Sequence, residues 1–126
     1  MSEDALRAFF TAYGAALAAG DLATVAAGYT LPALVLSDAG SIPIGSPEQI
    51  ASAAQLAFLD YQSRGVTAIH PRLTRVDPIS ATLTSADITW LYQNAEGSTF
   101  LEEAYRYLVR LDDAAGPLIQ VVVSRP

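Results

Sequence analysis

The spacing of apolar residues divides the chain into a helical first half and an extended second half. Apolar residues recur three and four positions apart after Ser2 and again after Asp21, which predicts two amphipathic helices with these residues as N-caps. Gly20 suits the end of the first helix, and Pro32 stops the second. A third helix is predicted to begin at residues 46–49, where a capping serine precedes a proline and a glutamine stands at the third helical position.

Strand-like alternation replaces the helical spacing from Val66 onward. Two short extended segments, 34–36 and 42–44, precede the third helix, and four longer runs follow it at 66–76, 81–93, 99–111 and 118–124. Turn-forming residues separate the longer runs, which suits a hairpin meander. A helical half followed by a meander is typical of an α+β fold. We therefore expect one domain over residues 1–126, with three helices packed on one face of an antiparallel sheet.

The composition favours a well-packed domain and argues against a nucleic-acid partner. Hydrophobic residues make up 52% of the chain and charged residues 16%, which leaves material for a core and for an apolar cavity. The net charge is −6, and the seven basic residues are spread from Arg7 to Arg125, whereas phosphate binding needs clustered cations. All seven are arginine in an alanine-rich chain, which indicates a bacterial source with a GC-rich genome.

The residue types that are missing exclude several kinds of site. The chain has no cysteine, and His70 is its only histidine, so we expect neither a disulfide frame nor a thiolate or multi-histidine metal site. It also lacks a glycine-rich phosphate loop, and we expect no cofactor. The first residues are acidic, and no apolar run approaches the roughly 18–20 residues of a membrane span, so a cytoplasmic location is expected.

The order of these elements resembles the NTF2-like and SnoaL-like superfamily. Four local patterns carry the resemblance, at 10–22 (FTAYGAALAAGDL), at Tyr29 followed by Pro32-Ala33, at Gly45 with 47–50, and at 80–82 before Trp90. The resemblance implies a cone-shaped domain, commonly dimeric through its sheet face, with a pocket between the concave sheet and the helices. It implies no single activity, because the superfamily includes isomerases, cyclases, dehydratases, carriers and assembly domains.

Within the superfamily, the resemblance to ketosteroid isomerases suggests catalytic candidates. Those enzymes use a helix-borne tyrosine, an aspartate base after the first strand and a neutral carboxylic acid on a late strand. Tyr13 matches the tyrosine, Asp38 lies one residue beyond the base position, and Tyr107 is nearest to the position of the acid. The alternatives are structural: an aromatic residue on an apolar helix stripe belongs to the core, and an aspartate before a turn glycine caps its own backbone.

Two further candidates for acid–base chemistry follow from strand alternation. Glu103 shares the apolar side of its strand with Tyr105 and Tyr107, where a carboxylate must be paired or hydrogen-bonded. His70 could act with Glu103 if the meander makes their strands neighbours. The alternatives are a bulge or edge position that exposes Glu103 to water, and an exposed edge position for His70 beside Pro71.

A set of aromatic residues is expected to line the pocket or to fill it as a core. Its members are Phe9, Tyr29, Phe58, Trp90, Tyr105 and Tyr107, and Tyr92 joins them because it alternates with Trp90 on the same strand. The function that fits best is binding of a small, mostly apolar molecule in this pocket. A cofactor-independent proton-transfer enzyme using Tyr13 with Glu103, Asp38 or His70 is one alternative. A homodimeric assembly domain whose own side chains fill the cavity is the other.

Overall fold

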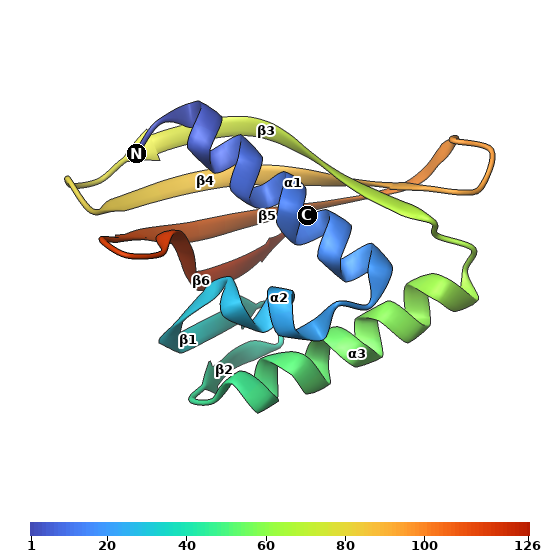
Figure 1. The fold of residues 1–126 in the computed structure, drawn as a ribbon, viewed down its shortest axis with the longest axis horizontal. Coiled ribbons are helices and arrows are strands. Elements are labelled where there is room, and N and C mark those ends of the chain that lie inside the picture. Colours follow the sequence, from blue (N-terminus) through green and yellow to red (C-terminus); the bar gives the residue numbers. More distant parts are fainter.

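Three helices lie across one face of a strongly curved sheet of six strands (Figure 1). The computed structural model describes all residues, 1–126. The helices are α1 (Glu3–Ala19), α2 (Leu22–Ala27) and α3 (Pro47–Ser63). The strands are β1 (Tyr29–Ser37), β2 (Gly40–Ile44), β3 (Ala68–Pro78), β4 (Leu83–Gln93), β5 (Thr99–Asp112) and β6 (Gly116–Arg125). The α+β fold expected from the sequence is confirmed.

The helix ends follow the capping residues that the sequence predicts. The side chains of Ser2 and Asp21 accept hydrogen bonds from the backbone N–H groups of Ala5 and Thr24. Gly20 ends α1 with a φ of 71°, a left-handed conformation that glycine adopts at little cost. At the start of α3, Ser46 and the glutamine three residues later exchange the two bonds of a capping box.

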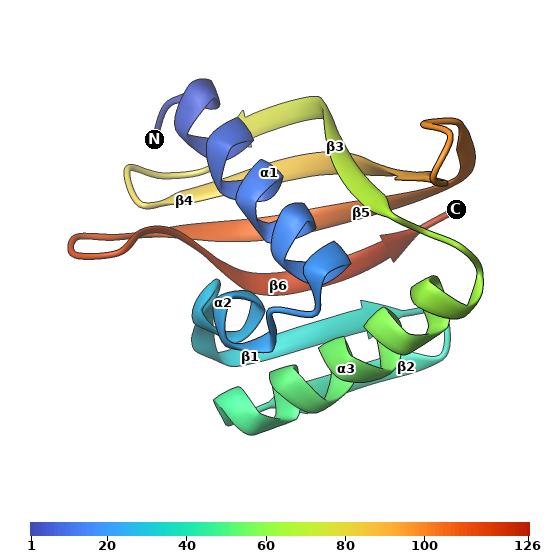
Figure 2. The ribbon, with the colours of Figure 1, turned by 45° about the vertical axis from the view of Figure 1, so that its right-hand side comes forward.

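The strands run in the order β2-β1-β6-β5-β4-β3. Strands β3 to β6 form the predicted antiparallel meander, whereas β1 lies parallel to β6 and joins β2 to the sheet (Figure 2). Strand β3 extends two residues beyond the predicted end, and its last residue, Pro78, pairs with Thr84 of β4. Proline is tolerated there because β3 is an edge strand whose outer side needs no hydrogen-bond donor.

The outer face of the sheet, away from the helices, holds one buried charge. Asp87 is 4% exposed and accepts two hydrogen bonds from Arg106, at 2.7 and 3.0 Å. Arg125 adds an ion pair at 3.2 Å. The hydrogen bonds from Arg106 hold the pKa of the Asp87 carboxyl below its usual value. These contacts compensate for the burial of the carboxylate and tie β4, β5 and β6 together.

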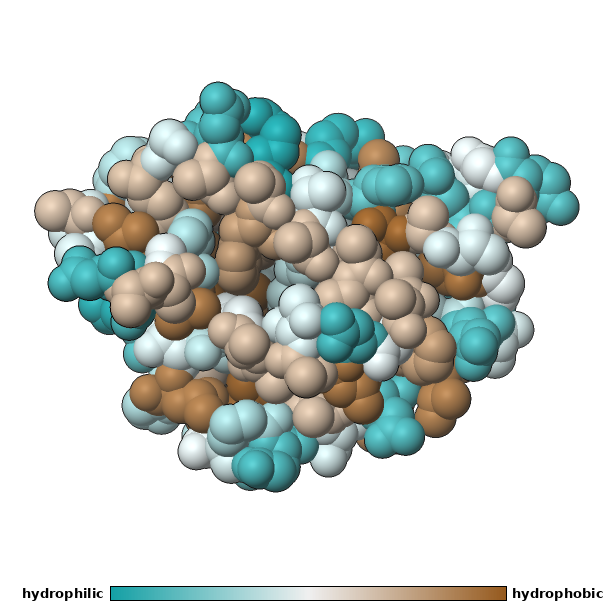
Figure 3. All heavy atoms as spheres, in the orientation of Figure 1, coloured by the Kyte–Doolittle hydropathy of each residue, from teal (hydrophilic) through white to brown (hydrophobic).

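The helices differ in how closely they pack on the sheet. Helix α1 packs on β3 through Leu6 and Phe10, which are fully buried among the inward side chains of β4 and β5. Helix α3 packs mainly on α2 and α1, through Ile50 and Ala54, and its backbone stays away from the sheet. The helix-covered side is largely weakly apolar, with hydrophilic residues gathered at its margins (Figure 3). Space is therefore left between α3 and the central strands.

Gly14 permits the close approach of α1 to the sheet. A Cβ atom at this position would lie 2.7 Å from the backbone oxygen of Ile69 and 2.8 Å from Cζ3 of Trp90. Both separations are shorter than van der Waals contact, and the first involves a backbone atom that cannot move alone. Only glycine fits between α1, β3 and the indole of Trp90.

We predict that Gly14→Ala destabilises the fold by about 1–3 kcal/mol, because overpacking exceeds the gain in helix propensity. The control is Thr11→Ala on the exposed side of the same helix, which should change stability by less than about 0.5 kcal/mol. Urea unfolding of both variants, followed by circular dichroism, measures the effect. A Gly14→Ala protein as stable as the wild type would contradict the close contact.

Candidate functional site

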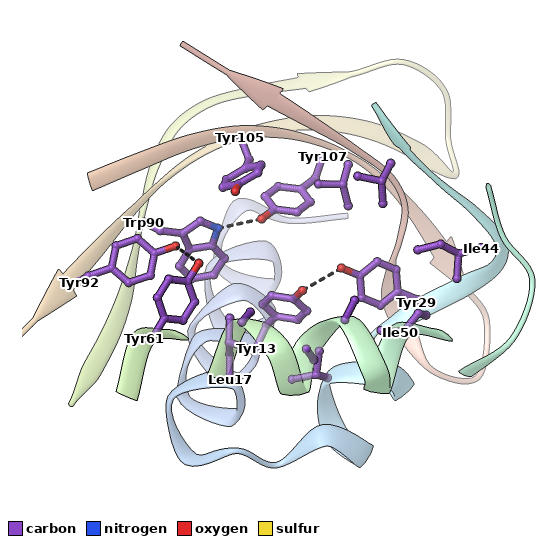
Figure 4. A pocket seen from close by; sticks show the side chains of 16 residues that line it. Tyr13, Leu17, Tyr29, Ile44, Ile50, Tyr61, Trp90, Tyr92, Tyr105 and Tyr107 are labelled. Carbon is purple, nitrogen blue, oxygen red and sulfur yellow. Dashed lines mark hydrogen bonds between the residues drawn. The ribbon is translucent and has the colours of Figure 1, made fainter. Parts of the chain in front are cut away.

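A cavity of about 230 Å³ lies between α3, α1, α2 and the concave face of the sheet. It is lined by aromatic and aliphatic side chains only: Tyr13, Leu17, Val25, Tyr29, Val35, Ile44, Ile50, Ala53, Ala54, Ala57, Tyr61, Trp90, Tyr92, Tyr105, Tyr107 and Val122 (Figure 4). This set includes all six tyrosines of the chain and its single tryptophan. The cavity is therefore apolar in its walls but contains six hydroxyl groups and one indole N–H.

Strand alternation and helix packing turn these aromatic residues inward. Trp90 and Tyr92 are two residues apart on β4, and Tyr105 and Tyr107 are two apart on β5, so each pair shares the inner face. Tyr13 and Tyr61 come from α1 and α3 on the opposite side of the cavity. Tyr29 opens β1, directly after Gly28 ends α2. The aromatic residues of the site thus come from five elements.

Hydrogen bonds join six of the seven polar groups of the cavity into three pairs, and the Tyr105 hydroxyl makes no such bond. The hydroxyls of Tyr13 and Tyr29 lie 2.8 Å apart. The indole Nε1–H of Trp90 donates to the Tyr107 hydroxyl at 2.8 Å. The hydroxyls of Tyr61 and Tyr92 lie 3.0 Å apart, and their rings are tilted by 34° with centroids 4.7 Å apart. Each of these polar groups is anchored by a neighbour, which fixes where it points.

Glu103 extends the third group beyond the cavity wall. Its Oε1 accepts hydrogen bonds from Tyr92 at 2.6 Å and from Tyr61 at 3.1 Å. The residue is paired with Trp90 in the β4–β5 ladder, so it lies on the inner face of the sheet and is half-buried. The carboxylate is therefore hydrogen-bonded through tyrosines of α3 and β4 that line the cavity.

Burial raises the pKa of every cavity tyrosine. Desolvation is the largest cause for all six, and the pKa values of Tyr13 and Tyr107 lie well above the ordinary value of 10.0. For Tyr92, the hydrogen bond to Glu103 raises the pKa further. The hydroxyls therefore remain protonated at neutral pH, and each has one proton to donate.

The structure brings six of the residues predicted from the sequence together around the cavity. These are Tyr13, Tyr29, Trp90, Tyr92, Tyr105 and Tyr107. The other two aromatic residues of the predicted set lie elsewhere. Phe9 packs outside the cavity against Phe10 and Tyr13, with ring centroids 5.0 and 6.5 Å away. Phe58 borders a separate hollow between α1 and α3.

Two acid–base candidates lie outside the cavity. Asp38 is exposed in the turn between β1 and β2. His70 is exposed on the outer face of β3, and β4 lies between β3 and β5. Glu103 faces the inner side of β5, so the expectation that His70 and Glu103 stand on neighbouring strands is wrong. His70 is paired with Leu91, and alternation places both on the face opposite Trp90.

Tyr61 belongs to the site but was absent from the predicted lining, whereas Tyr92 was expected there from its alternation with Trp90. The signals for both are present in the sequence, because Tyr61 continues the apolar stripe of α3 and Tyr92 alternates with Trp90. Their link to Glu103 has no local signal, since it joins α3 to β4 and β5 across 31 and 42 residues.

No three histidine, cysteine, aspartate or glutamate side chains of the chain lie close enough together to bind a metal ion. None of the three helices is long and apolar enough to span a membrane.

The outer face of the sheet carries no helix (Figure 1). A homodimer through this face stays a prediction, and light scattering of the protein in solution would test it.

The raised tyrosine pKa values predict resistance to alkaline ionisation. In the unfolded chain the tyrosines ionise near pH 10, whereas the folded protein keeps their protons at higher pH. Their contribution to stability is therefore complete below about pH 10 and is lost as the pH rises above it. A titration of phenolate absorbance should show no ionisation at pH 10 while circular dichroism reports the native fold. Protein unfolded in guanidinium is the control, and reversible native-state ionisation near pH 10 would contradict the burial.

Comparison with known proteins places this arrangement in a family. The family described as NTF2-like protein (DUF6841) matches residues 2–126. Among solved structures, an NTF2-like protein of unknown function from Shewanella oneidensis superimposes with a TM-score of 0.75 at 17% identity, over 98% of both chains. The protein Aln2 from a Streptomyces species gives 0.73 at 14% identity, over 99% of this chain and 93% of its own.

A ketosteroid isomerase-like protein from Erwinia carotovora atroseptica gives a TM-score of 0.63 at 16% identity, over 98% of this chain and 95% of its own. A search of curated proteins found no match. At these identities the solved structures show only that the fold is shared, and they say nothing about a shared activity. The family match covers nearly the whole chain, and the resemblance inferred from the sequence is confirmed: the chain belongs to the NTF2-like family DUF6841.

Proposed function

We propose that the protein binds a small, mostly apolar molecule that carries a hydrogen-bond-accepting oxygen, in the cavity between α3 and the sheet. The observation that carries this proposal is the hydrogen bond from Trp90 Nε1 to the Tyr107 hydroxyl, at 2.8 Å. An indole N–H can only donate, so the Tyr107 oxygen is the acceptor and its own proton is free. Tyr107 is thus a fixed donor in an apolar cavity.

A second spare proton comes from the Tyr13–Tyr29 pair. The two hydroxyls share one hydrogen bond of 2.8 Å, which uses one of their two protons. The other proton is available to a bound molecule. A carbonyl, ether or phenolic oxygen would accept such bonds, whereas a purely hydrocarbon ligand would displace water and leave the donors unsatisfied.

The size and lining of the cavity limit the ligand further. Its volume of about 230 Å³ lies below the roughly 300–1,000 Å³ typical of sites for drug-sized molecules. A cavity of this size suits a ligand of roughly one or two rings. The aromatic walls favour a flat, apolar body, because ring stacking and edge contacts add to the gain from apolar burial.

Calorimetry with two matched probes tests the proposal. The probes are 2-acetylnaphthalene and 2-isopropenylnaphthalene, which differ by a carbonyl oxygen in place of a methylene group. We expect Tyr107→Phe to weaken binding of the ketone about tenfold, the effect of one hydrogen bond, and to leave the hydrocarbon within about threefold. Phe58→Leu, outside the cavity, is the control and should alter neither. Absence of binding by both probes, or equal losses in Tyr107→Phe, would overturn the proposal.

A proton-transfer enzyme is a second candidate, favoured by the carboxylate of Glu103 behind the cavity wall. Its Oε1 is reached through the hydroxyls of Tyr61 and Tyr92. A proton taken from a bound ketone would pass through these hydroxyls, which suits a relay. Such an enzyme should exchange the acetyl protons of 2-acetylnaphthalene for deuterium in heavy water, as measured by NMR, and Glu103→Gln should abolish this exchange. Exchange no faster than in buffer would remove this candidate.

A further inference from the structure

The two sides of the cavity differ in their supply of hydrogen-bond protons. The Tyr61–Tyr92 pair lies on one side and the Tyr13–Tyr29 pair on the other (Figure 4). Tyr92 donates its only proton to Glu103 Oε1 at 2.6 Å. Tyr61 also donates its proton within this group. Its hydroxyl lies 3.1 Å from Glu103 Oε1 and 3.0 Å from the Tyr92 oxygen, and either can accept the bond. Neither hydroxyl retains a proton for a ligand.

On the Tyr61–Tyr92 side, the two tyrosine oxygens can still accept hydrogen bonds. A phenolic oxygen that donates its proton still has lone pairs. Donation to a carboxylate also polarises the hydroxyl and makes its oxygen a stronger acceptor. The Tyr61 and Tyr92 oxygens that line the cavity are thus acceptors, whereas Tyr105, Tyr107 and the Tyr13–Tyr29 pair have protons to donate.

We propose that the cavity selects a two-ended molecule. Its accepting oxygen lies at Tyr107 and the Tyr13–Tyr29 pair, and a hydroxyl or amine group at its other end donates to Tyr61 or Tyr92. Hydroxylated aromatic ketones are the simplest members of this class. This inference rests on the proposed binding function and makes Glu103 a specificity-determining residue, although Glu103 itself is not part of the cavity lining.

The same arrangement disfavours an anionic group at this end of the ligand. The Glu103 carboxylate lies directly behind the two oxygens, at 2.6 and 3.1 Å. No arginine lines the cavity to offset a second negative charge. Carboxylic acids and phosphate esters directed toward Tyr61 are therefore disfavoured by charge repulsion, and neither Tyr61 nor Tyr92 has a proton to donate to them.

The test compares hydroxyl and fluoro probes on the same ring system. The probes are the 5-, 6- and 7-acetyl-2-naphthols and the corresponding acetyl-2-fluoronaphthalenes, since fluorine is close to hydroxyl in size but carries no proton. The three isomers vary the distance between the two ends. For the best-fitting isomer, we expect the naphthol to bind about tenfold more tightly than its fluoro analogue in calorimetry with the wild-type protein.

Two variants then locate the effect. Glu103→Gln removes the charge that polarises the two hydroxyls, because the amide offers them either a neutral accepting oxygen or an N–H that occupies their lone pairs. In both orientations Tyr61 and Tyr92 become weaker acceptors, so the naphthol preference should fall to within about threefold. In Tyr107→Phe both probes should weaken and their ratio should be preserved. Circular dichroism confirms the fold of each variant, and the wild-type comparison stands if Glu103→Gln does not fold.

The outcomes separate this inference from the proposed function. If none of the ketones binds the wild-type protein, the proposed function fails and the inference fails with it. If the ketones bind but naphthol and fluoro probes bind equally for every isomer, the inference alone is overturned. A naphthol preference that persists unchanged in a folded Glu103→Gln protein would also overturn it, because the preference would then not depend on the carboxylate.

Discussion

The contact of helix α1 with the sheet at Gly14 determines where the cavity lies. With no side chain at this position, α1 rests directly on β3 and on the indole of Trp90. Helix α3 has no such contact and is supported by α1 and α2 instead. The sheet therefore curves around a space that is closed at α1 and open beneath α3. The aromatic residues of β4 and β5 fill the closed part and line the open part.

Pairing of hydroxyl groups makes it possible to bury so many tyrosines in one apolar space. A buried hydroxyl without a partner is costly, and the structure contains no buried side-chain nitrogen or oxygen without a hydrogen bond. The pairing also has a consequence for recognition, because each hydroxyl has only one proton. Where an indole supplies the bond, the tyrosine proton is left over. Where a carboxylate receives it, only lone pairs remain. The same physical requirement thus gives the two sides of the cavity different chemistry.

Much of the fold could be predicted because its signals are local. Ser2, Asp21 and Ser46 cap the helices that follow them, and the alternation along β5 gives the correct inner face for Glu103, Tyr105 and Tyr107. The parallel pairing of β1 with β6 joins residues more than 80 positions apart, as between Leu34 and Val121, and leaves no local pattern. Which residues lie next to His70 also depends on the order of the strands, and this order has no local pattern in the sequence.

The site could be predicted in part, for reasons that differ among residues. Side chains alternate between the two faces of a strand, so the inward positions of Trp90, Tyr105 and Tyr107 could be predicted from the sequence. Positions on a helix stripe are less sharply defined, because an apolar stripe is wider than the part of it that faces a cavity. Phe9 and Phe58 lie on such stripes but outside the cavity, whereas Tyr61 lies on its stripe and reaches Glu103. That contact depends on how far α3 stands from the sheet, which is a property of the assembled fold.

We propose the space beneath α3 as the binding site of a compact, mostly apolar molecule. A crystal structure of the protein purified from cells, at a resolution that distinguishes water from an organic molecule, tests it most directly. We expect continuous density for a flat molecule among the six tyrosines, with a polar atom within hydrogen-bond distance of the Tyr107 hydroxyl. A cavity filled by the protein's own side chains, with α3 closed onto the sheet, would contradict it.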